Sequence, residues 1–263
     1  NLSLLISSEM WRVYAAPGRL VNVTVINPDG ARSVPRSFVR EGVSLSATTV
    51  SAASYLSTNA LTPEAIATVF GFNLAIASDV ADSTPLPTRL AGTTVRVNGI
   101  LAPLFYVSPG QINFLIPAKT QPGTAIIEIT SADGTISRSE INVAAIAPAI
   151  FTSNSQGTGA PAALATADGV SYYGVGNPDG TPNYVQTGHY LVLYGTGFRY
   201  ALTDEVKITI GGINAPVLYA GAQPNFLGLD QLNTQIPTGI SGTVDLVVTV
   251  TGKAANVVKL RVR

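Results

Sequence analysis

The chain repeats one of its own segments, and this repeat limits the folds that it can adopt. Thr93–Pro117 reads TTVRVNGILAPLFYVSPGQINFLIP, and the same order of residues returns in Lys207–Pro237 as KITIGGINAPVLYAGAQPNFLGLDQLNTQIP. In the first half of the segment the copies keep one offset, as Gly99 and Gly212 show (212 − 99 = 113). A period of this length is too long for a solenoid unit, so each copy is expected to be a small domain.

The second copy contains a loop insertion. In the last half of the segment the offset grows, as Gln111 and Gln231 show (231 − 111 = 120), so seven residues (120 − 113 = 7) are added between Tyr219 and Gln231. The segments on both sides keep their order. The insertion therefore predicts a longer loop between two strands that stay in register.

Composition favours strands and tight turns. Only 11% of the 263 residues are charged, and the chain is rich in Val, Thr, Ala, Gly and Pro, which suits packed strands better than helices or disorder. The 15 basic residues balance the 15 acidic ones without a basic cluster, so no nucleic-acid partner is expected. No apolar run reaches the roughly 18 to 20 residues of a membrane helix, so no membrane insertion is expected. The absence of Cys excludes disulfide, zinc-thiolate and thiol chemistry but leaves the compartment open.

Three hairpins of similar pattern punctuate the chain. An alternating strand, a Gly-containing turn and a second strand occur near Val21–Val39, again in Gly123–Val143 and again in Gly242–Val262. The sequence therefore predicts tandem all-β domains: residues 1–42 as the closing half of one module, and residues 43–148 and 149–263 as two complete ones. A half sandwich cannot bury its face alone.

The strands of the first complete copy are predicted near 93–98, 103–107, 111–116, 124–130 and 136–143. Pro63–Phe70 could be read as a helix start, but its likeness to the second copy favours a strand from about Ile66. We expect a loop over Ala77–Pro87, irregular surface chain with short strands over Ser153–Asn183, and a short strand at Leu2–Ile6. Short strands about ten residues apart are typical of an immunoglobulin-like (Ig-like) antiparallel β-sandwich.

A resemblance to a known family rests on the motif NGILAPLFYVSPGQINFLIP, preceded by SAASY, VFGFNLA and PLPTRLAGTTV. This pattern resembles the uncharacterised C-terminal repeat of large secreted acidobacterial proteins, which is itself similar to the Ig-like IPT/TIG modules. The resemblance covers roughly residues 44–263. It implies an Ig-like fold and an extracellular or cell-surface location, and it supplies no catalytic residue because the family has no assigned activity.

Candidate catalytic and metal-binding residues are few. His189, the only histidine, starts an apolar strand, and no G-x-S-x-G elbow occurs. Calcium ligands could come from Asp79 with Asp82, or Asp204 with Glu205, but no calcium-loop motif is present. Turn chemistry accounts for the aspartates that precede glycine, which are Asp29, Asp133, Asp168 and Asp179. We therefore predict no enzyme, no cofactor and no metal site.

Tyrosines offer the one candidate binding surface. Tyr172, Tyr173 and Tyr184 lie in a Gly-rich segment and could stack on sugar rings, although aromatic residues more often cover a core. Tyr106 and Tyr219 recur at equivalent positions and are predicted to be core or corner residues.

Three functions stay open at this stage. The first is a non-catalytic structural or adhesive module of a secreted or cell-surface bacterial protein, with other protein modules as partners. The second is a subunit of an extracellular filament, in which residues 1–42 pair with another copy by strand addition. The third is a carbohydrate-binding module with polysaccharide as partner.

Overall fold

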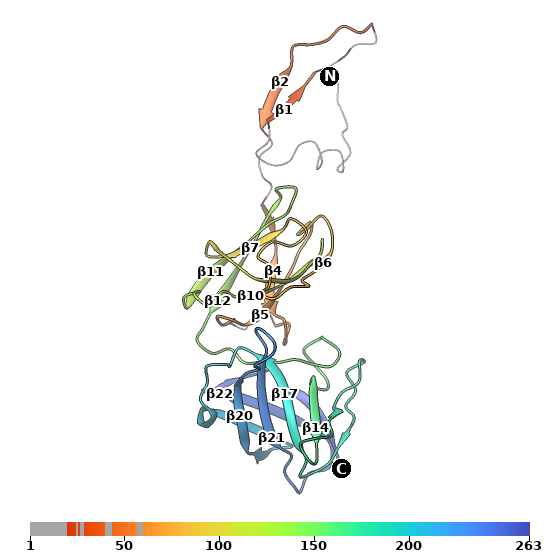
Figure 1. The fold of residues 1–263 in the computed structure, drawn as a ribbon, viewed down its shortest axis with the longest axis vertical. Helices are drawn as coiled ribbons and strands as arrows, with labels where there is room; N and C mark the ends of the chain where they lie inside the picture. Colours follow the sequence, from red (N-terminus) through yellow and green to blue (C-terminus); the bar gives the residue numbers. More distant parts are fainter. Residues whose placement is uncertain (1–19, 25, 27–28, 40–43, 57–59) are drawn as a thin grey trace.

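Two β-sandwiches stacked end to end, preceded by a hairpin, make up the fold (Figure 1). The structure is a computed structural model that describes residues 20–24, 26, 29–39, 44–56 and 60–263. Within these residues the regular structure is β, apart from one 3₁₀ turn at Thr203–Glu205. The predicted all-β class of tandem Ig-like sandwiches is confirmed.

The first sandwich consists of two five-stranded sheets. One sheet has the order β4 (Thr48–Ser51), β5 (Ile66–Phe70), β10 (Gln111–Leu115), β9 (Leu104–Val107) and β6 (Asp79–Val80). The other has the order β3 (Ser44–Ser46), β12 (Ile136–Val143), β11 (Gly123–Thr130), β7 (Thr94–Val97) and β8 (Ile100–Leu101). Pairing is antiparallel except between β3 and β12.

The second sandwich repeats this plan with two six-stranded sheets. One contains β15 (Tyr173–Gly174), β14 (Ala163–Thr166), β17 (Tyr190–Thr196), β21 (Asp230–Gln235) and β20 (Val217–Ala222), with β13 (Ala149–Ile150) also on β17. The other contains β16 (Tyr184–Val185), β24 (Val258–Val262), β22 (Gly242–Val250), β18 (Val206–Ile210) and β19 (Ile213–Ala215), with β23 (Lys253–Ala254) on β22. The edge strand β16 runs parallel to β24, as β3 does to β12.

The repeated sequence occupies equivalent places in the two sandwiches. Asn98 and Gly99 turn the β7–β8 hairpin with φ of 47° and 82°, and Gly211 and Gly212 turn β18–β19 with φ of 59° and 80°. Two positive φ angles suit a tight hairpin turn, which explains the recurrence of glycine. Open space surrounds both Gly99 and Gly212, so their environments match.

The Gln-x-Asn pair of each copy makes the same contact. Gln111 Nε2 donates to Asn113 Oδ1 at 2.9 Å, and Gln231 Nε2 donates to Asn233 Oδ1 at 2.9 Å. Both asparagines lie beside a register shift in the partner strand. The residues that repeat in the sequence thus make the same side-chain contacts in both sandwiches.

The tyrosines that recur with these pairs lie opposite the asparagines on the neighbouring strands. Tyr106 pairs with Asn113 and is half-buried, and Tyr219 pairs with Asn233. Tyr219 is 38% exposed, and its hydroxyl donates to the Ala222 carbonyl at 2.7 Å. Tyr219 is therefore not a core residue, and its corner position stays a prediction.

Each sandwich has its own hydrophobic core. One cluster runs from Leu61 to Val143 and the other from Ile150 to Val262, with Phe114 and Phe198 among the largest fully buried side chains. Strand β12 alternates between buried and exposed residues, the pattern of a strand with one solvated face. Each fully buried large apolar side chain contributes about 1.5–3 kcal/mol.

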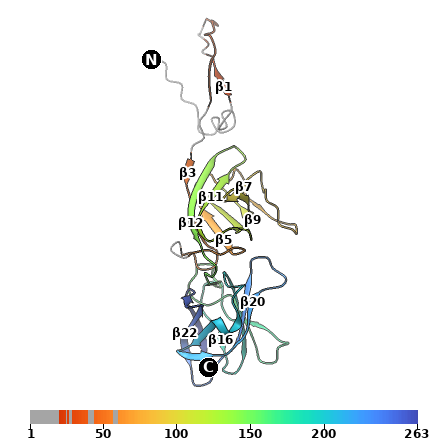
Figure 2. The same ribbon diagram turned by 90° about the vertical axis from the view of Figure 1, so that its left-hand side faces the viewer.

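The N-terminal hairpin stands apart from both sandwiches (Figures 1 and 2). Strand β1 (Leu20–Val23) pairs with β2 (Arg36–Val39) in an antiparallel two-stranded sheet. Among the described residues no third strand joins this sheet, so its outer edges are open. The predicted strand at Leu2–Ile6 lies outside the described residues.

Two predictions about loops need correction. Ala77–Pro87, predicted as a loop, contains the two-residue strand β6, which pairs with β9 because its backbone is extended at the sheet edge. Ser153–Asn183, predicted as irregular surface chain with short strands, contains the short strands β14 and β15, but it also buries Ala163, Ala165 and Val175 in the second core. Ala163 and Ala165 belong to β14, which pairs with β17, so their side chains face the core of the second sandwich. Ile66–Phe70 is a strand as predicted, and the domain boundaries at 42/43 and 148/149 stay a prediction.

Candidate functional site

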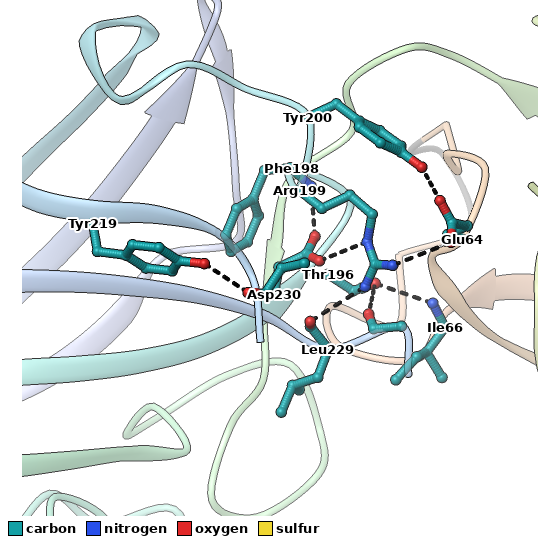
Figure 3. Close-up of polar contacts among 11 residues, drawn as sticks. Glu64, Ile66, Thr196, Phe198, Arg199, Tyr200, Tyr219, Leu229 and Asp230 are labelled. Atoms are coloured by element: carbon teal, nitrogen blue, oxygen red, sulfur yellow. Dashed lines mark hydrogen bonds and ion pairs between the residues drawn. The ribbon is translucent and has the colours of Figure 1, made fainter. Parts of the chain in front are cut away.

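The two sandwiches meet in a polar joint, which we take as the candidate site (Figure 3). We call the end at which β5 or β17 begins the tail of a sandwich, and the end at which it finishes the head. The tail of the first sandwich, around Glu64 and Ile66, contacts the head of the second, around Thr196, Arg199 and Asp230.

Thr196 links the backbones of the two sandwiches. The Ile66 amide donates to Thr196 Oγ1 at 3.0 Å, and the Thr196 hydroxyl donates to the Gly228 carbonyl at 2.9 Å. Thr196 is 1% exposed, so both bonds form out of water. A buried hydroxyl with donor and acceptor both satisfied favours one geometry.

Two glycines let the sandwiches approach closely. A Cβ on Gly228 would lie 2.6 Å from both Ile66 Cγ1 and Leu115 Cδ1 of the first sandwich. A Cβ on Gly157 would lie 2.1 Å from the Ser54 carbonyl oxygen. Both glycines also have positive φ, so two independent constraints exclude a side chain at these places.

The connecting residues 144–148 are held at both ends. The Ala144 amide donates to Leu61 at 2.8 Å on the first sandwich, and the Ala147 amide donates to Gly197 at 3.0 Å on the second. Lys253 Nζ donates to the Ile146 carbonyl at 2.9 Å. The connection is thus part of the joint, because backbone hydrogen bonds fix it to each sandwich.

Arg199 is the centre of the ionic contacts. Its Nε donates to Asp230 Oδ1 at 3.0 Å, its Nη2 donates to the Leu229 carbonyl at 3.3 Å, and its Nη1 lies 3.5 Å from Glu64 Oε1. The Arg199 side chain is 10% exposed, and Tyr200 donates its hydroxyl to the other oxygen of Glu64. The planar guanidinium, with several fixed donors, holds three segments together.

Asp230 is fully buried beneath this arginine. Burial raises the pKa of Asp230 to about 6, and the Phe198 amide, which donates to Oδ2 at 2.8 Å, and the Arg199 charge oppose that rise. Burial disfavours the charged form, and the partners compensate only in part. The joint therefore contains a carboxyl group that titrates close to neutral pH.

Glu64 adopts a backbone conformation that usually belongs to glycine. Its φ is 60°, and Gly188, the equivalent residue of the second sandwich, has φ of 81°. The two residues also make equivalent hydrogen bonds. The Glu64 amide donates to the Ile116 carbonyl at 2.8 Å, and the Gly188 amide donates to the Ile236 carbonyl at 2.8 Å. A non-glycine residue at such φ costs of order 1 kcal/mol, and here the side chain that causes the cost contacts Arg199.

The predicted tyrosines lie toward the free tail of the second sandwich. Tyr172 is 51% exposed, and Tyr173 is half-buried with its hydroxyl 2.9 Å from His189 Nδ1. His189 is therefore engaged with a tyrosine at the start of β17. This contact gives the only histidine a structural partner.

Tyr184 is 45% exposed and is covered by cationic side chains. The Arg261 guanidinium carbon lies 4.0 Å from the ring centroid, and that of Arg263 lies 5.5 Å away. Tyr184 belongs to β16 and Tyr173 to β15, in opposite sheets. The structure thus places the three predicted tyrosines in one region but gives each its own surroundings, and no finding tests a binding role for them.

The other candidate residues are engaged in local structure. Asp168 Oδ1 accepts the Val170 and Ser171 amides, and these bonds lower its pKa to about 2, as expected of turn chemistry. Glu205 accepts the Leu202 amide at 2.9 Å within the 3₁₀ turn. Within the part of the chain that the structure describes, no three His, Cys, Asp or Glu residues gather as metal ligands, and no helix could cross a membrane.

Sequence reasoning did not identify the joint. Thr196 links the two backbones, and a Cβ on the neighbouring Gly197 would lie 2.0 Å from the Ala147 carbonyl oxygen, yet no motif marks either residue. One signal was present, because Gly228 lies in the segment between Tyr219 and Gln231, which is seven residues longer in the second copy. The insertion builds the surface on which the first sandwich rests.

The sheets and the joint define the class of protein: Ig-like β-sandwiches stacked in tandem. Within the second sandwich, residues 180–260 match the family model of the IPT/TIG domain. The comparison with curated proteins finds no match. The finer resemblance to an acidobacterial repeat stays a prediction.

The solved structures to which this chain is similar are distant in sequence. The SGBP-B protein of the Bacteroides ovatus mixed-linkage glucan utilization locus, in complex with a mixed-linkage heptasaccharide, is 13% identical over 93% of this chain and 52% of its own, with a TM-score of 0.38. Domains 5–6 of the S-layer protein SbsC are 13% identical over 81% of this chain and 94% of theirs, with a TM-score of 0.30. The chain spans only 36% to 52% of the glycan-binding proteins that it matches.

Proposed function

We propose that this chain is a non-catalytic structural array in a secreted or cell-surface protein, and that it holds its sandwiches in one fixed end-to-end arrangement. The observation that carries the proposal is the joint. Arg199, Thr196 and Gly228 all contact the first sandwich from the second, and each contact requires one orientation of the two bodies.

Domains joined by a short segment usually move relative to one another unless their interface prevents it. Here the connecting residues 144–148 are themselves hydrogen-bonded to both sandwiches. A hinge motion would disrupt the hydrogen bonds of the buried Thr196 hydroxyl and of the nearly buried Arg199 guanidinium. It would also separate the close backbone contacts at Gly157 and Gly228. The chain therefore acts as a rigid spacer that sets the distance between whatever lies at its two ends.

Distance measurements between spin labels test this proposal. The chain has no Cys, so Glu140→Cys on β12 and Thr243→Cys on β22, both exposed, introduce one label on each sandwich. We expect one narrow distance distribution, which broadens when Thr196→Val and Arg199→Met are combined. Lys259→Met, which removes an exposed ion pair with Asp245 within the second sandwich, is the matched control and should leave the distribution narrow. A broad distribution in the unmodified joint would refute the rigid spacer.

A second candidate function is carbohydrate binding, which the exposure of Tyr172 and Tyr184 supports. One face of the Tyr184 ring carries Arg261, so a sugar would stack on the other face or on Tyr172. We expect glycan-array binding that disappears in Tyr172→Ala, Tyr173→Ala and survives in Tyr219→Ala, a tyrosine outside this region. An array without binding would argue against this function.

A third candidate is a filament subunit that assembles by strand addition through residues 1–42. The open edges of β1 and β2 support it, because unpaired edges are templates for pairing. Electron microscopy should then show polymers, and a chain that stays monomeric would eliminate it.

A further inference from the structure

Among the residues that the structure describes, two ends of the pair of sandwiches have no neighbouring sandwich. The joint connects the tail of the first sandwich to the head of the second, so the head of the first and the tail of the second remain. Strand register relates the positions of the two sandwiches, since Gln111 pairs with Phe70 and Gln231 pairs with Tyr194 (194 − 70 = 124). Residues on this element of the first sandwich thus have an equivalent 124 positions later.

The turn after β5 and β17 confirms this relation. A Cβ on Gly71 would contact Leu74, and a Cβ on Gly195 would contact Phe198, each three residues on. Asn73 and Gly197 both have positive φ, at 56° and 91°. By the same relation Phe72 corresponds to Thr196.

The unused head of the first sandwich is apolar. Phe72 is 82% exposed and Ile76 is 59% exposed, at the positions where the second sandwich has Thr196 and Tyr200. Thr196 and Tyr200 are residues through which the second sandwich contacts its neighbour. The free head therefore shows large apolar side chains at the positions that make contacts in the existing joint.

The unused tail of the second sandwich offers a matching surface. Tyr190, 42% exposed, stands where the first sandwich has Ile66, the residue that contacts Thr196. The two free ends lack the residues that form the ion pair of the joint. Arg199 corresponds to Ala75 on the free head, and Glu64 corresponds to Gly188 on the free tail, so neither end presents an unpaired charge at this place.

We propose that the free head of the first sandwich docks the free tail of the second sandwich of another copy of this chain, with Phe72 against Tyr190. The inference rests on the proposed rigid spacer, because it repeats the geometry of the internal joint. An apolar and aromatic contact replaces the ionic one. Burial of these rings from both sides supplies the association energy.

A head-to-tail contact of this kind joins two different surfaces and does not close on itself, so copies add in a line. The contact lacks the covalent connection that raises the effective concentration of the two ends in the internal joint. Association should therefore depend on protein concentration. In the internal joint, the connecting residues 144–148 enter the head of the second sandwich beside the contact surface. A chain segment that enters the head of the first sandwich in the same way would therefore leave room for docking.

Sedimentation velocity on the full chain, over a concentration series, tests the proposal. We expect a growing series of oligomers that Phe72→Glu reduces to monomer. Ile126→Glu, an exposed apolar residue on the side of β11, is the matched control and should leave the series unchanged. Monomer at all concentrations, or oligomers that persist in Phe72→Glu, would overturn the docking.

Two further variants separate this contact from other modes of association. A mixture of Phe72→Cys and Tyr190→Cys proteins should form a mixed disulfide dimer on oxidation, faster than a mixture of Ile126→Cys and Tyr190→Cys. If Ser37→Pro in β2 abolishes assembly and Phe72→Glu does not, the hairpin carries the association and the docking is wrong. The spin-label distance in dilute monomer reports the internal joint alone, so failure of the rigid spacer is recognised independently.

Discussion

Replacing Asp230 with asparagine should change how the stability of the second sandwich depends on pH. The carboxyl is fully buried, and burial raises its pKa to about 6 from the ordinary 3.8. The folded state therefore holds the proton more tightly than the unfolded state does. The stability that this gives is fully present below pH 3.8 and is lost as pH rises through about 6, after which it stays constant.

The size of this effect follows from the same pKa values. The difference between 3.8 and about 6 corresponds to about 3 kcal/mol, at roughly 1.4 kcal/mol per pH unit. Asparagine resembles the neutral carboxylic acid and cannot titrate, so Asp230→Asn lacks this loss. Asparagine has one acceptor oxygen where Asp230 accepts from both the Phe198 amide and Arg199 Nε, so the variant loses one of these two hydrogen bonds, at about 1–2 kcal/mol. We expect the variant to be less stable at pH 4 and at least as stable as the parent at pH 7.

Urea denaturation at a series of pH values from 4 to 8, followed by circular dichroism, measures these free energies. The stability difference between the two proteins removes the contribution of the other titrating groups, because these are common to both. The expected result is a difference that changes sign as pH rises. A constant difference across the series would show that Asp230 has an ordinary pKa and that burial at the joint is not what governs it.

Other substitutions test the packing of the joint and of the cores. Gly228→Ala places a Cβ 2.6 Å from Ile66 at positive φ and should lower the free energy of unfolding by about 2–4 kcal/mol. Gly212→Ala, with similar φ and open space, should lower it by only about 1 kcal/mol. Equal losses in urea denaturation would contradict the close contact at Gly228. Glu64→Gly removes backbone strain and the contact with Arg199, so the first sandwich should keep its melting temperature within a few degrees while the spin-label distance broadens; a distance that stays narrow would show the ion pair to be dispensable. Phe114→Ala empties a fully buried site and should destabilise the first sandwich by about 3–5 kcal/mol in urea, and a smaller loss would indicate a core that collapses around the site.

Much of the fold could be predicted because the strands of each sandwich have a local pattern of alternating apolar and polar residues. The alternation in Ile136–Val143 matches the burial along β12, and the paired hairpin glycines mark turns that need positive φ. Internal repetition added what a single copy lacks, since it decided for a strand over a helix at Ile66. The burial of Ala163 and Ala165 on β14 was not predicted, because small side chains give only a weak hydrophobic pattern in a segment rich in turn residues.

The joint could not be predicted because its partners are far apart in sequence and carry no common motif. Glu64 and Arg199 meet only after two sandwiches have formed and stacked. In the sequence Asp230 does not differ from the other acidic residues, because the burial that raises its pKa is a property of the folded chain. The candidate tyrosines, in contrast, were visible as residue types, but their role depends on a ligand that sequence does not specify.

The differences between the copies locate the joint better than their likeness does. Gln-x-Asn pairs and turn glycines recur because every sandwich needs them. Glu64 in place of glycine, Thr196 in place of Phe72, and the inserted loop that carries Gly228 are departures that a single sandwich does not need, and all three meet at one interface. In a chain built by duplication, positions where one copy departs from the other at some energetic cost are where the contacts between copies should be sought. The same reasoning identifies Phe72, exposed where its equivalent is buried, as a position with a contact still to be made.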